Sequence, residues 1–263
     1  MLDLAELQSV LLAMAPVFAA AAVALLLEAV FPWRKVAMDG LRWVTAIALS
    51  LCGWALINLT SPFATLISAE FAQRNEFGLF HAIDLPLWLT VPVGVIGIDF
   101  SIFASHLAMH KIPLLWKFHR VHHSDEHLDA STTFLFHPID MMITTVSGAL
   151  VVLLLGLPPL AVAIGFGMHL IFSFWQHANV RALPFQRSMS HVIMTPELHR
   201  LHHSTNPDHY NQNYAALFTF WDLLFRTLRP SRPGDGDLSF GLDSLQWTHS
   251  RTLFSLLAAP FRR

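Results

Sequence analysis

The sequence predicts an all-α membrane protein, a polytopic bundle of about four to five membrane helices with a histidine-rich helical cap on the cytoplasmic side. Hydrophobic residues make up 54% of the 263-residue chain and charged residues 13%. The mean hydropathy is +0.50, which is too apolar for a soluble domain of this size. Histidines gather in short boxes between and after the apolar runs. The net charge of -2 gives no electrostatic support to binding of nucleic acid.

The first three membrane helices are expected within residues 1–105. Their apolar runs cover residues 10–31, 43–59 and 83–103. The first run follows acidic rather than basic residues, so we interpret it as a retained helix and not as a signal peptide. Arg34, Lys35 and Arg42 come after it, and the positive-inside tendency places their loop in the cytoplasm. The third run then returns the chain to that side.

The second half of the chain predicts a membrane hairpin followed by a more polar part. Two apolar runs within residues 141–177 flank the turn sequence from Gly156 to Pro159, so the pair enters the bilayer and returns. Residues 178–263 are less apolar and richer in arginine, and we expect them to be cytoplasmic and to end in a helix on the membrane surface. The whole chain, residues 1–263, is expected to form one domain.

Three histidine boxes are the candidate metal ligands, and the first two lie within residues 106–140. The boxes are His106-x-x-x-His110, His119-x-x-His122-His123 and His199-x-x-His202-His203. Positions three and four apart share one face of a helix, so we expect each box to aim its imidazoles the same way. Neutral imidazole is the commonest metal ligand, and eight exceed what one tetrahedral ion can use. The boxes therefore predict a two-metal centre.

The alternative is that these histidines are ordinary core residues, which is the usual role of a single histidine on an apolar face. Burying clustered imidazoles without a metal leaves polar nitrogens in need of partners, so we favour metal binding. Asp99 is an acid deep in the third apolar run, seven residues before His106. We expect it to accept a hydrogen bond from an imidazole N–H, the alternative being an acid that faces water at the interface.

The boxes and their flanks form an ordered set of motifs. The segments are Asp99, His106–His110, Leu115–Ser124, Phe136–Pro138, His177–Val180, Thr195–Ser204, Asn213–Tyr214 and Trp221–Thr227. In this set the sequence resembles the fatty acid hydroxylase and sterol desaturase superfamily of integral-membrane di-iron enzymes. It departs from the usual pattern at Phe103, Leu107 and Asp140, where that superfamily usually has Tyr, Arg and Glu, but no departure removes a ligand.

The resemblance implies a ligand set and a role for two acids. The ligands would be His106, His110, His119, His122, His123, His199, His202 and His203, with His177 from the hairpin. His169 would be a tenth, because that superfamily commonly draws one or two ligands from this helix; it lies eight residues before His177, on roughly the same helix face. Asp99 and Asp222 would orient ligands.

An all-imidazole donor set accepts several metals, including iron and zinc. Metallopeptidase boxes carry a glutamate beside a ligand histidine as general base, whereas these boxes carry Arg120-Val121 and Arg200-Leu201, and Glu197 precedes the third box. A membrane zinc hydrolase is therefore the weaker alternative, although zinc could substitute for the native metal. The resemblance implies two iron ions and O2 as co-substrate, in hydroxylation or desaturation of a fatty acyl or sterol-like lipid drawn from the bilayer.

Electrons would have to come from a separate ferredoxin, cytochrome or reductase, because the chain has no dinucleotide fingerprint and no cysteine set for an iron–sulfur cluster. Two further alternatives are a haem-carrying membrane protein and a non-enzymatic one. Haem ligation favours isolated histidines on facing helices, and a degenerate enzyme is expected to have lost ligands. The compact length and the lack of a retrieval signal favour a bacterial inner membrane over the endoplasmic reticulum.

Overall fold

The computed structural model is almost entirely helical. It describes residues 4–36, 39–60, 64–83, 85–232, 235, 238–242 and 252–262, apart from the side chains of residues 4–11, 13 and 184. In these residues β structure is limited to two isolated bridges, Pro32 with Val180 and Ile193 with Phe218. The all-α prediction is therefore confirmed.

Five long helices form the bundle. They are α1 (Leu4–Val30), α2 (Gly40–Leu59), α5 (Leu87–Lys111), α7 (Pro138–Leu155) and α8 (Pro159–His177). In the described part of the chain, α2, α5, α7 and α8 are long and apolar enough to cross a membrane, and α1 contributes a shorter apolar stretch, Met14–Val30. A helix of 20 residues is about 30 Å long, which matches the hydrocarbon thickness. The predicted membrane bundle is thus confirmed.

The turn between α7 and α8 shows why the hairpin forms where the sequence predicts it. Gly156 ends α7 in the left-handed region, with φ 70° and ψ 45°. A Cβ atom at this position would lie 2.6 Å from the carbonyl oxygen of Phe77, so glycine is required. Pro159 then occupies the first turn of α8, where its missing N–H costs nothing.

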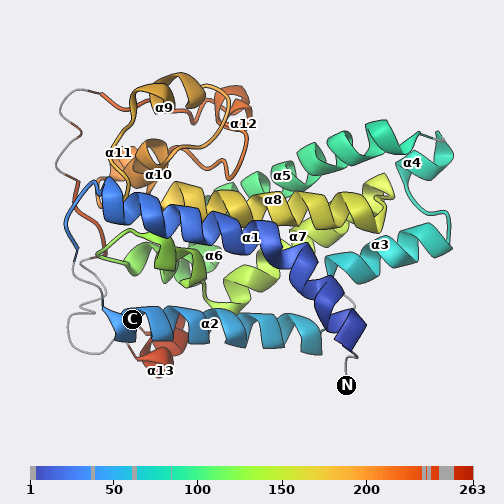
Figure 1. Ribbon diagram of the computed structural model, residues 1–263, viewed down its shortest axis with the longest axis horizontal. Coiled ribbons are helices and arrows are strands. Elements are labelled where there is room, and N and C mark those ends of the chain that lie inside the picture. Colours follow the sequence, from blue (N-terminus) through green and yellow to red (C-terminus); the bar gives the residue numbers. More distant parts are fainter. Residues whose placement is uncertain are drawn as a thin grey trace.

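The long helices run side by side along the length of the molecule (Figure 1), with α5 packed against α7 and α8, α2 against α7, and α1 against α8. Two short helices, α3 (Thr65–Arg74) and α4 (Leu79–Ala82), lie at one end of the bundle. Large apolar side chains face outward from the long helices, including Leu26, Trp54 and Leu154, which are 62%, 63% and 69% exposed. Such an outer surface is suited to contact with lipid.

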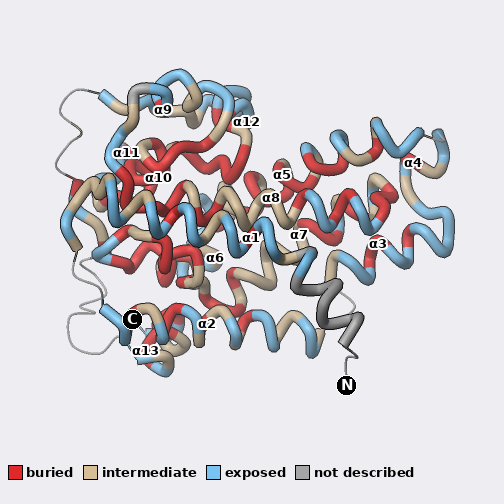
Figure 2. Tube along the Cα trace, in the orientation of Figure 1, coloured by how far each residue is buried: buried red, intermediate tan, exposed pale blue. Residues whose placement is uncertain are grey.

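The opposite end carries the cap. Its elements are α6 (Pro113–His119), η2 (His122–Ser124), η3 (Ala130–Phe134), α9 (Pro184–Met189), α10 (Pro196–His203), α11 (Pro207–Tyr210), α12 (Phe220–Leu224), α13 (Leu253–Ala258) and η6 (Ala259–Phe261). Figure 2 shows that α10 is buried along most of its length, whereas α9 is largely exposed. The C-terminal helix α13 packs against α2. Its contact with a membrane surface stays a prediction.

Two charged side chains from the first two helices tie the bundle to the cap. Arg42 is buried in the first turn of α2 and donates to Asp125 Oδ1 at 3.1 Å and to Asp129 Oδ2 at 2.8 Å. Glu28 of α1 accepts from the backbone N–H groups of Ala130 at 2.7 Å and Asn179 at 2.8 Å. Both contacts lie beside histidine-bearing segments, so the ends of α1 and α2 are part of the support of the cap.

Candidate metal centre

The first histidine box belongs to a membrane helix. Helix α5 continues without a break to Lys111, so His106 and His110 lie one turn apart on the cap end of that helix. The predicted boundary at residue 105 is therefore not a structural break. A rigid helix carries both rings, which fixes their separation before any metal binds.

The second and third boxes have different local structures. In the second box, His119 ends α6, and His122 with His123 lies on the short η2 turn. The third box is a continuous helix, α10, with Pro196 in its first turn. The Thr195 side chain accepts the Leu198 N–H and so caps this helix.

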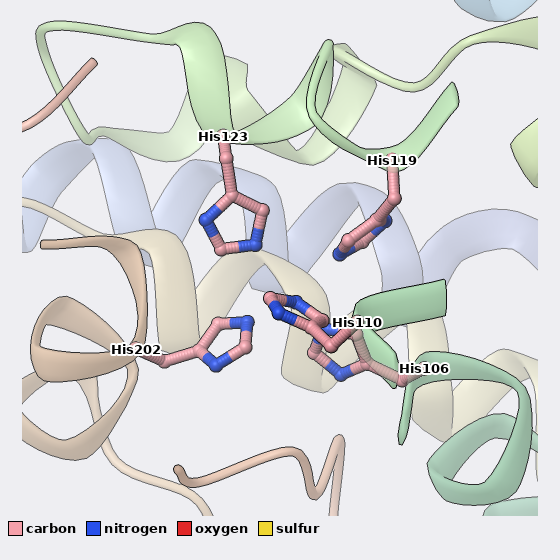
Figure 3. A group of neighbouring side chains, drawn as sticks. All are labelled: His106, His110, His119, His123 and His202. Atoms are coloured by element: carbon pink, nitrogen blue, oxygen red, sulfur yellow. The ribbon is translucent and has the colours of Figure 1, made fainter. Parts of the chain in front are cut away.

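All of the predicted ligands except His169 fall into two groups. The first group is His106, His110, His119, His123 and His202, and the second is His122, His177, His199 and His203. Within each group, one ring nitrogen from every member lies within 4.8 Å of the others. Figure 3 shows the first group, whose rings reach a common space from α5, from the second box and from α10.

The prediction that each box aims all its rings the same way agrees with the first box, whose His106 and His110 both belong to the first group, but it is wrong for the second and third boxes. In the second box, His119 and His123 belong to the first group and His122 belongs to the second group. In α10 the division is reversed, because His202 belongs to the first group and the other two histidines belong to the second. Successive residues on a helix are about 100° apart, so neighbouring histidines diverge while residues four apart stay close. Each of these boxes therefore contributes to both groups.

Backbone carbonyls orient four of the rings. The Nδ1–H groups of His106, His122, His177 and His202 donate to the carbonyl oxygens of Tyr214 at 2.7 Å, Leu135 at 3.2 Å, Ser173 at 2.7 Å and Gln212 at 2.8 Å. A carbonyl oxygen only accepts, so in each ring the hydrogen is on Nδ1. The lone pair on Nε2 is consequently free to bind a metal.

Asp140 orients a fifth ring. His119 Nδ1 lies 2.7 Å from Asp140 Oδ2, and the two side chains are 2% and 1% exposed. This carboxylate–histidine pair is the arrangement that commonly fixes a metal-binding imidazole. The sequence marks Asp140 only as a departure from a family pattern, and the one local signal for its role is its place in the first turn of a helix, just after His137-Pro138.

Asp99 has a different role from the predicted one. It accepts from Leu217 N at 3.1 Å, Phe218 N at 3.2 Å and the Trp221 indole at 2.9 Å. The expected hydrogen bond from an imidazole is replaced by contacts with this loop, because the loop packs directly over the buried face of α5. Asp99 therefore holds the loop that follows Tyr214 and not a histidine ring.

Asp222 acts on the same loop and comes closer to a ligand. Its carboxylate accepts from Tyr214 N at 2.8 Å and Ala215 N at 2.9 Å. The carbonyl of Tyr214 is the acceptor for His106, so Asp222 holds the peptide that orients this ring. Asp222 therefore contacts the imidazole indirectly, through one peptide group, and its role in orienting a ligand stays a prediction.

The ring nitrogens of both groups fit metal ions. In the first group all five Nε2 atoms are buried without a hydrogen-bond partner. Each unpaired buried polar atom costs about 1–3 kcal/mol, so five together would rival the whole stability of a domain, about 5–15 kcal/mol. A cation bound between them removes this cost.

The second group leads to the same conclusion by distance. His177 Nε2 lies 3.2 Å from His122 Nε2 and 2.9 Å from His199 Nε2. His122 and His177 both carry their hydrogen on Nδ1, so their facing Nε2 lone pairs repel each other unless a cation lies between them. Nitrogens bound at about 2.1 Å to a tetrahedral ion are about 3.4 Å apart, close to the observed separations.

Burial keeps the cap histidines neutral, which is the form that binds metal. It lowers the pKa of His202 to about 3 and lowers the pKa values of His122, His123, His199 and His203 well below 6.5. Repulsion between neighbouring imidazolium charges acts in the same direction. The site is therefore prepared for metal at neutral pH.

A cavity of about 60 Å³ borders both groups on the side of the membrane helices. Its wall includes Ile102 and Met109 of α5 and Thr144 of α7. His169 is also in this wall and belongs to neither group. Glu197 lines a separate pocket with Trp33 and Arg200, so its position does not favour a role as general base beside the histidines.

Comparison with known proteins agrees with this geometry. The chain is 29% identical to an alkylglycerol monooxygenase of Danio rerio over 78% of the chain and 45% of that protein. It is 31% identical to the ornithine lipid hydroxylase OlsE of Rhizobium tropici over 80% of the chain and 61% of that protein. It is also 31% identical to a cholesterol 25-hydroxylase of Rattus norvegicus, over 50% of the chain and 44% of that protein.

The chain thus spans about half the length of the curated relatives it matches. No solved structure gives a significant match. Residues 91–227, about half the chain, match the family described as fatty acid hydroxylase, and this range contains every histidine of both groups. The chain therefore belongs to the fatty acid hydroxylase family.

Proposed function

We propose that this protein is an integral-membrane, O2-dependent oxidoreductase that hydroxylates or desaturates a C–H bond of a lipid. The observation that carries the proposal is the presence of two imidazole groups, which share two histidine boxes, beside a cavity among membrane helices. In this proposal a substrate dissolved in the bilayer reaches the cavity from between these helices. The relatives are named as an alkylglycerol monooxygenase, an ornithine lipid hydroxylase and a cholesterol 25-hydroxylase, which supports a lipid substrate.

The metal in this proposal is iron, one ion in each group. The first ion would be held by His106, His110, His119, His123 and His202, and the second by His122, His177, His199 and His203. Nitrogen donors alone accept zinc as well, so the choice of iron rests on the family. Bound iron would supply the capacity to bind O2 and to oxidise an unactivated C–H bond.

The overall reaction requires an external reductant. Hydroxylation consumes the substrate C–H, one O2, two electrons and two protons, and yields the alcohol and one water. Desaturation uses the same O2, electrons and protons, and yields a C=C bond and two waters. The two electrons would come from a separate ferredoxin, cytochrome or reductase that docks at the cap.

The protein's own residues would orient and shield the centre. Asp140 and four backbone carbonyls set the direction of the ligand rings. Apolar cavity residues, such as Ile102 and Met109, would receive a hydrocarbon chain and limit access of water. We place the cap on the cytoplasmic side of the membrane, with support from the cationic residues near the ends of α1 and α8, including Arg34 and Arg181. The membrane in this proposal is a bacterial inner membrane.

The test is metal analysis of purified protein combined with lipid analysis of cells that express it. We expect two iron ions per chain and a lipid that gains one oxygen or loses two hydrogens. The His199→Ala and His202→Ala variants, one from each group, should lose the lipid change while remaining in the membrane. Zinc in the purified protein together with an unchanged lipid profile would overturn the proposal.

A further inference from the structure

Helix α8 presents a polar stripe to the cavity beside the metal centre. His169, Ser173, Gln176 and His177 all line this cavity, at helical positions that share one face. The remainder of the helix is mostly apolar. Polar groups inside a membrane helix are costly, so each of these four calls for a partner.

Two members of the stripe have partners within the protein. The carbonyl of Ser173 accepts the N–H of His177 at 2.7 Å and the hydroxyl of Thr133 at 3.1 Å. His177 also faces the second group through its Nε2 atom. These two residues therefore belong to the metal centre.

Gln176 and His169 are not satisfied in this way. Gln176 is 5% exposed, and its Oε1 atom is buried without a hydrogen-bond partner. The Nδ1 atom of His169 is likewise buried without a partner. A buried polar atom that stays unpaired loses the hydrogen bonds it would make in water, so both atoms carry a free-energy cost. A plain hydrocarbon chain in the cavity would leave both costs in place.

The cavity itself limits what can pair with them. Its volume of about 60 Å³ has room for a few water-sized groups. No arginine or lysine is among its described wall residues, and the buried Asp140 is, so an anionic group is disfavoured. A neutral hydroxyl both donates and accepts, and so matches an amide and an imidazole in either ring tautomer.

We propose that Gln176 and His169 recognise a hydroxyl group of the lipid substrate close to the C–H bond that is oxidised. The hydroxyl donates to Gln176 Oε1 and exchanges a hydrogen bond with the His169 ring. Gln176 precedes the ligand His177 and lines the same cavity, which places this recognition beside the metals. The inference rests on the proposed function and deepens it, since it names hydroxyl-bearing lipids as the substrate class.

The experiment compares two probes, hexadecanol and its methyl ether, with iron-loaded protein in lipid nanodiscs. The ether lacks the hydrogen that the hydroxyl donates. We expect wild-type kcat/KM to be about 5- to 150-fold higher for the alcohol, which is the cost of one unpaired buried acceptor, about 1–3 kcal/mol, converted at 1.4 kcal/mol per tenfold. Gln176→Leu should bring this ratio close to one, and His169→Phe should lower it by a smaller factor.

Gln186→Leu is the matched control. Gln186 is also a buried glutamine whose amide atoms have no hydrogen-bond partner, but it lies on α9 and not in the cavity wall. This variant should keep the wild-type ratio. A second readout is thermal unfolding of zinc-loaded protein, which needs no turnover. Hexadecanol should raise the midpoint of wild type and Gln186→Leu and leave that of Gln176→Leu unchanged.

Equal kcat/KM values for both probes in wild type would overturn the inference and indicate that an ordered water pairs with Gln176. An unchanged ratio in Gln176→Leu would also overturn it. If wild type oxidises neither probe nor any cellular lipid, the proposed function fails instead. The zinc-loaded unfolding experiment then still decides whether the cavity recognises a hydroxyl.

Discussion

Replacing Asp140 by asparagine should weaken one metal site and spare the other. Asp140 contacts His119 Nδ1 at 2.7 Å, and both side chains are shielded from water. His119 belongs only to the first group. Asparagine keeps the volume and one acceptor oxygen but loses the charge, and hydrogen bonds to charged groups are about twice as strong as neutral ones.

The size of the effect follows from this contact. Removal of the partner of a metal-binding histidine costs about 10- to 100-fold in metal affinity, or about 1.4–2.8 kcal/mol. We expect the first ion of Asp140→Asn to be removed at correspondingly lower chelator concentration, whereas the second ion keeps its wild-type affinity. The assay is a chelator titration of iron-loaded protein, with bound iron counted per chain.

Asp208→Asn is the control, because Asp208 is an exposed acid in the first turn of α11 and contacts no ring of either group. It loses a charge near a helix N-terminus, as Asp140→Asn does, but should keep both ions. The reasoning is refuted if Asp140→Asn binds both ions as tightly as wild type, or if both ions weaken equally.

Three further predictions concern metal content and stability. His177→Ala should bind one ion per chain instead of two, because the Nε2 atom of His177 lies within 3.2 Å of two other ring nitrogens; two bound ions would contradict this. In metal-free protein, burial lowers the pKa of His202 to about 3, so the unfolded chain binds more protons as pH falls from about 6.5 to 3. The free energy of unfolding should therefore decline as the pH falls through that window. A free energy of unfolding that does not change with pH, measured by chemical unfolding, would count against neutral buried rings. Arg42→Met leaves the buried carboxylate of Asp125 and the partly buried carboxylate of Asp129 without their guanidinium and should destabilise the fold by about 3–5 kcal/mol in detergent unfolding. A loss below about 1 kcal/mol would show that this ion-pair network does not support the cap.

Much of the architecture is predictable from the sequence because its signals are local. The lengths of the apolar runs predict the membrane helices, and the glycine and prolines from Gly156 to Pro159 predict the hairpin. The prediction places the first box after a membrane helix, whereas α5 continues through His110. Histidine is compatible with a helix, so the local sequence does not show whether the helix ends before His106 or continues past it.

The hydrogen-bond acceptors that orient the histidine rings cannot be predicted from local sequence. His106 finds its acceptor at Tyr214, 108 residues away, and His119 finds its own at Asp140, 21 residues away. The acid expected beside an imidazole, Asp99, instead holds a loop that is 118 residues further on. Such pairs depend on how helices dock, which single-sequence patterns do not contain.

The sequence by itself determined the number of histidine boxes, their chemistry and their place beside membrane helices. Only the tertiary structure decided which ring joins which group, and it left His169 in the cavity wall. The physical reason is that neighbouring residues of a helix point about 100° apart, so one box can serve two sites. Which site each ring meets is set by the packing of α5, α6, α8 and α10 around a shared centre.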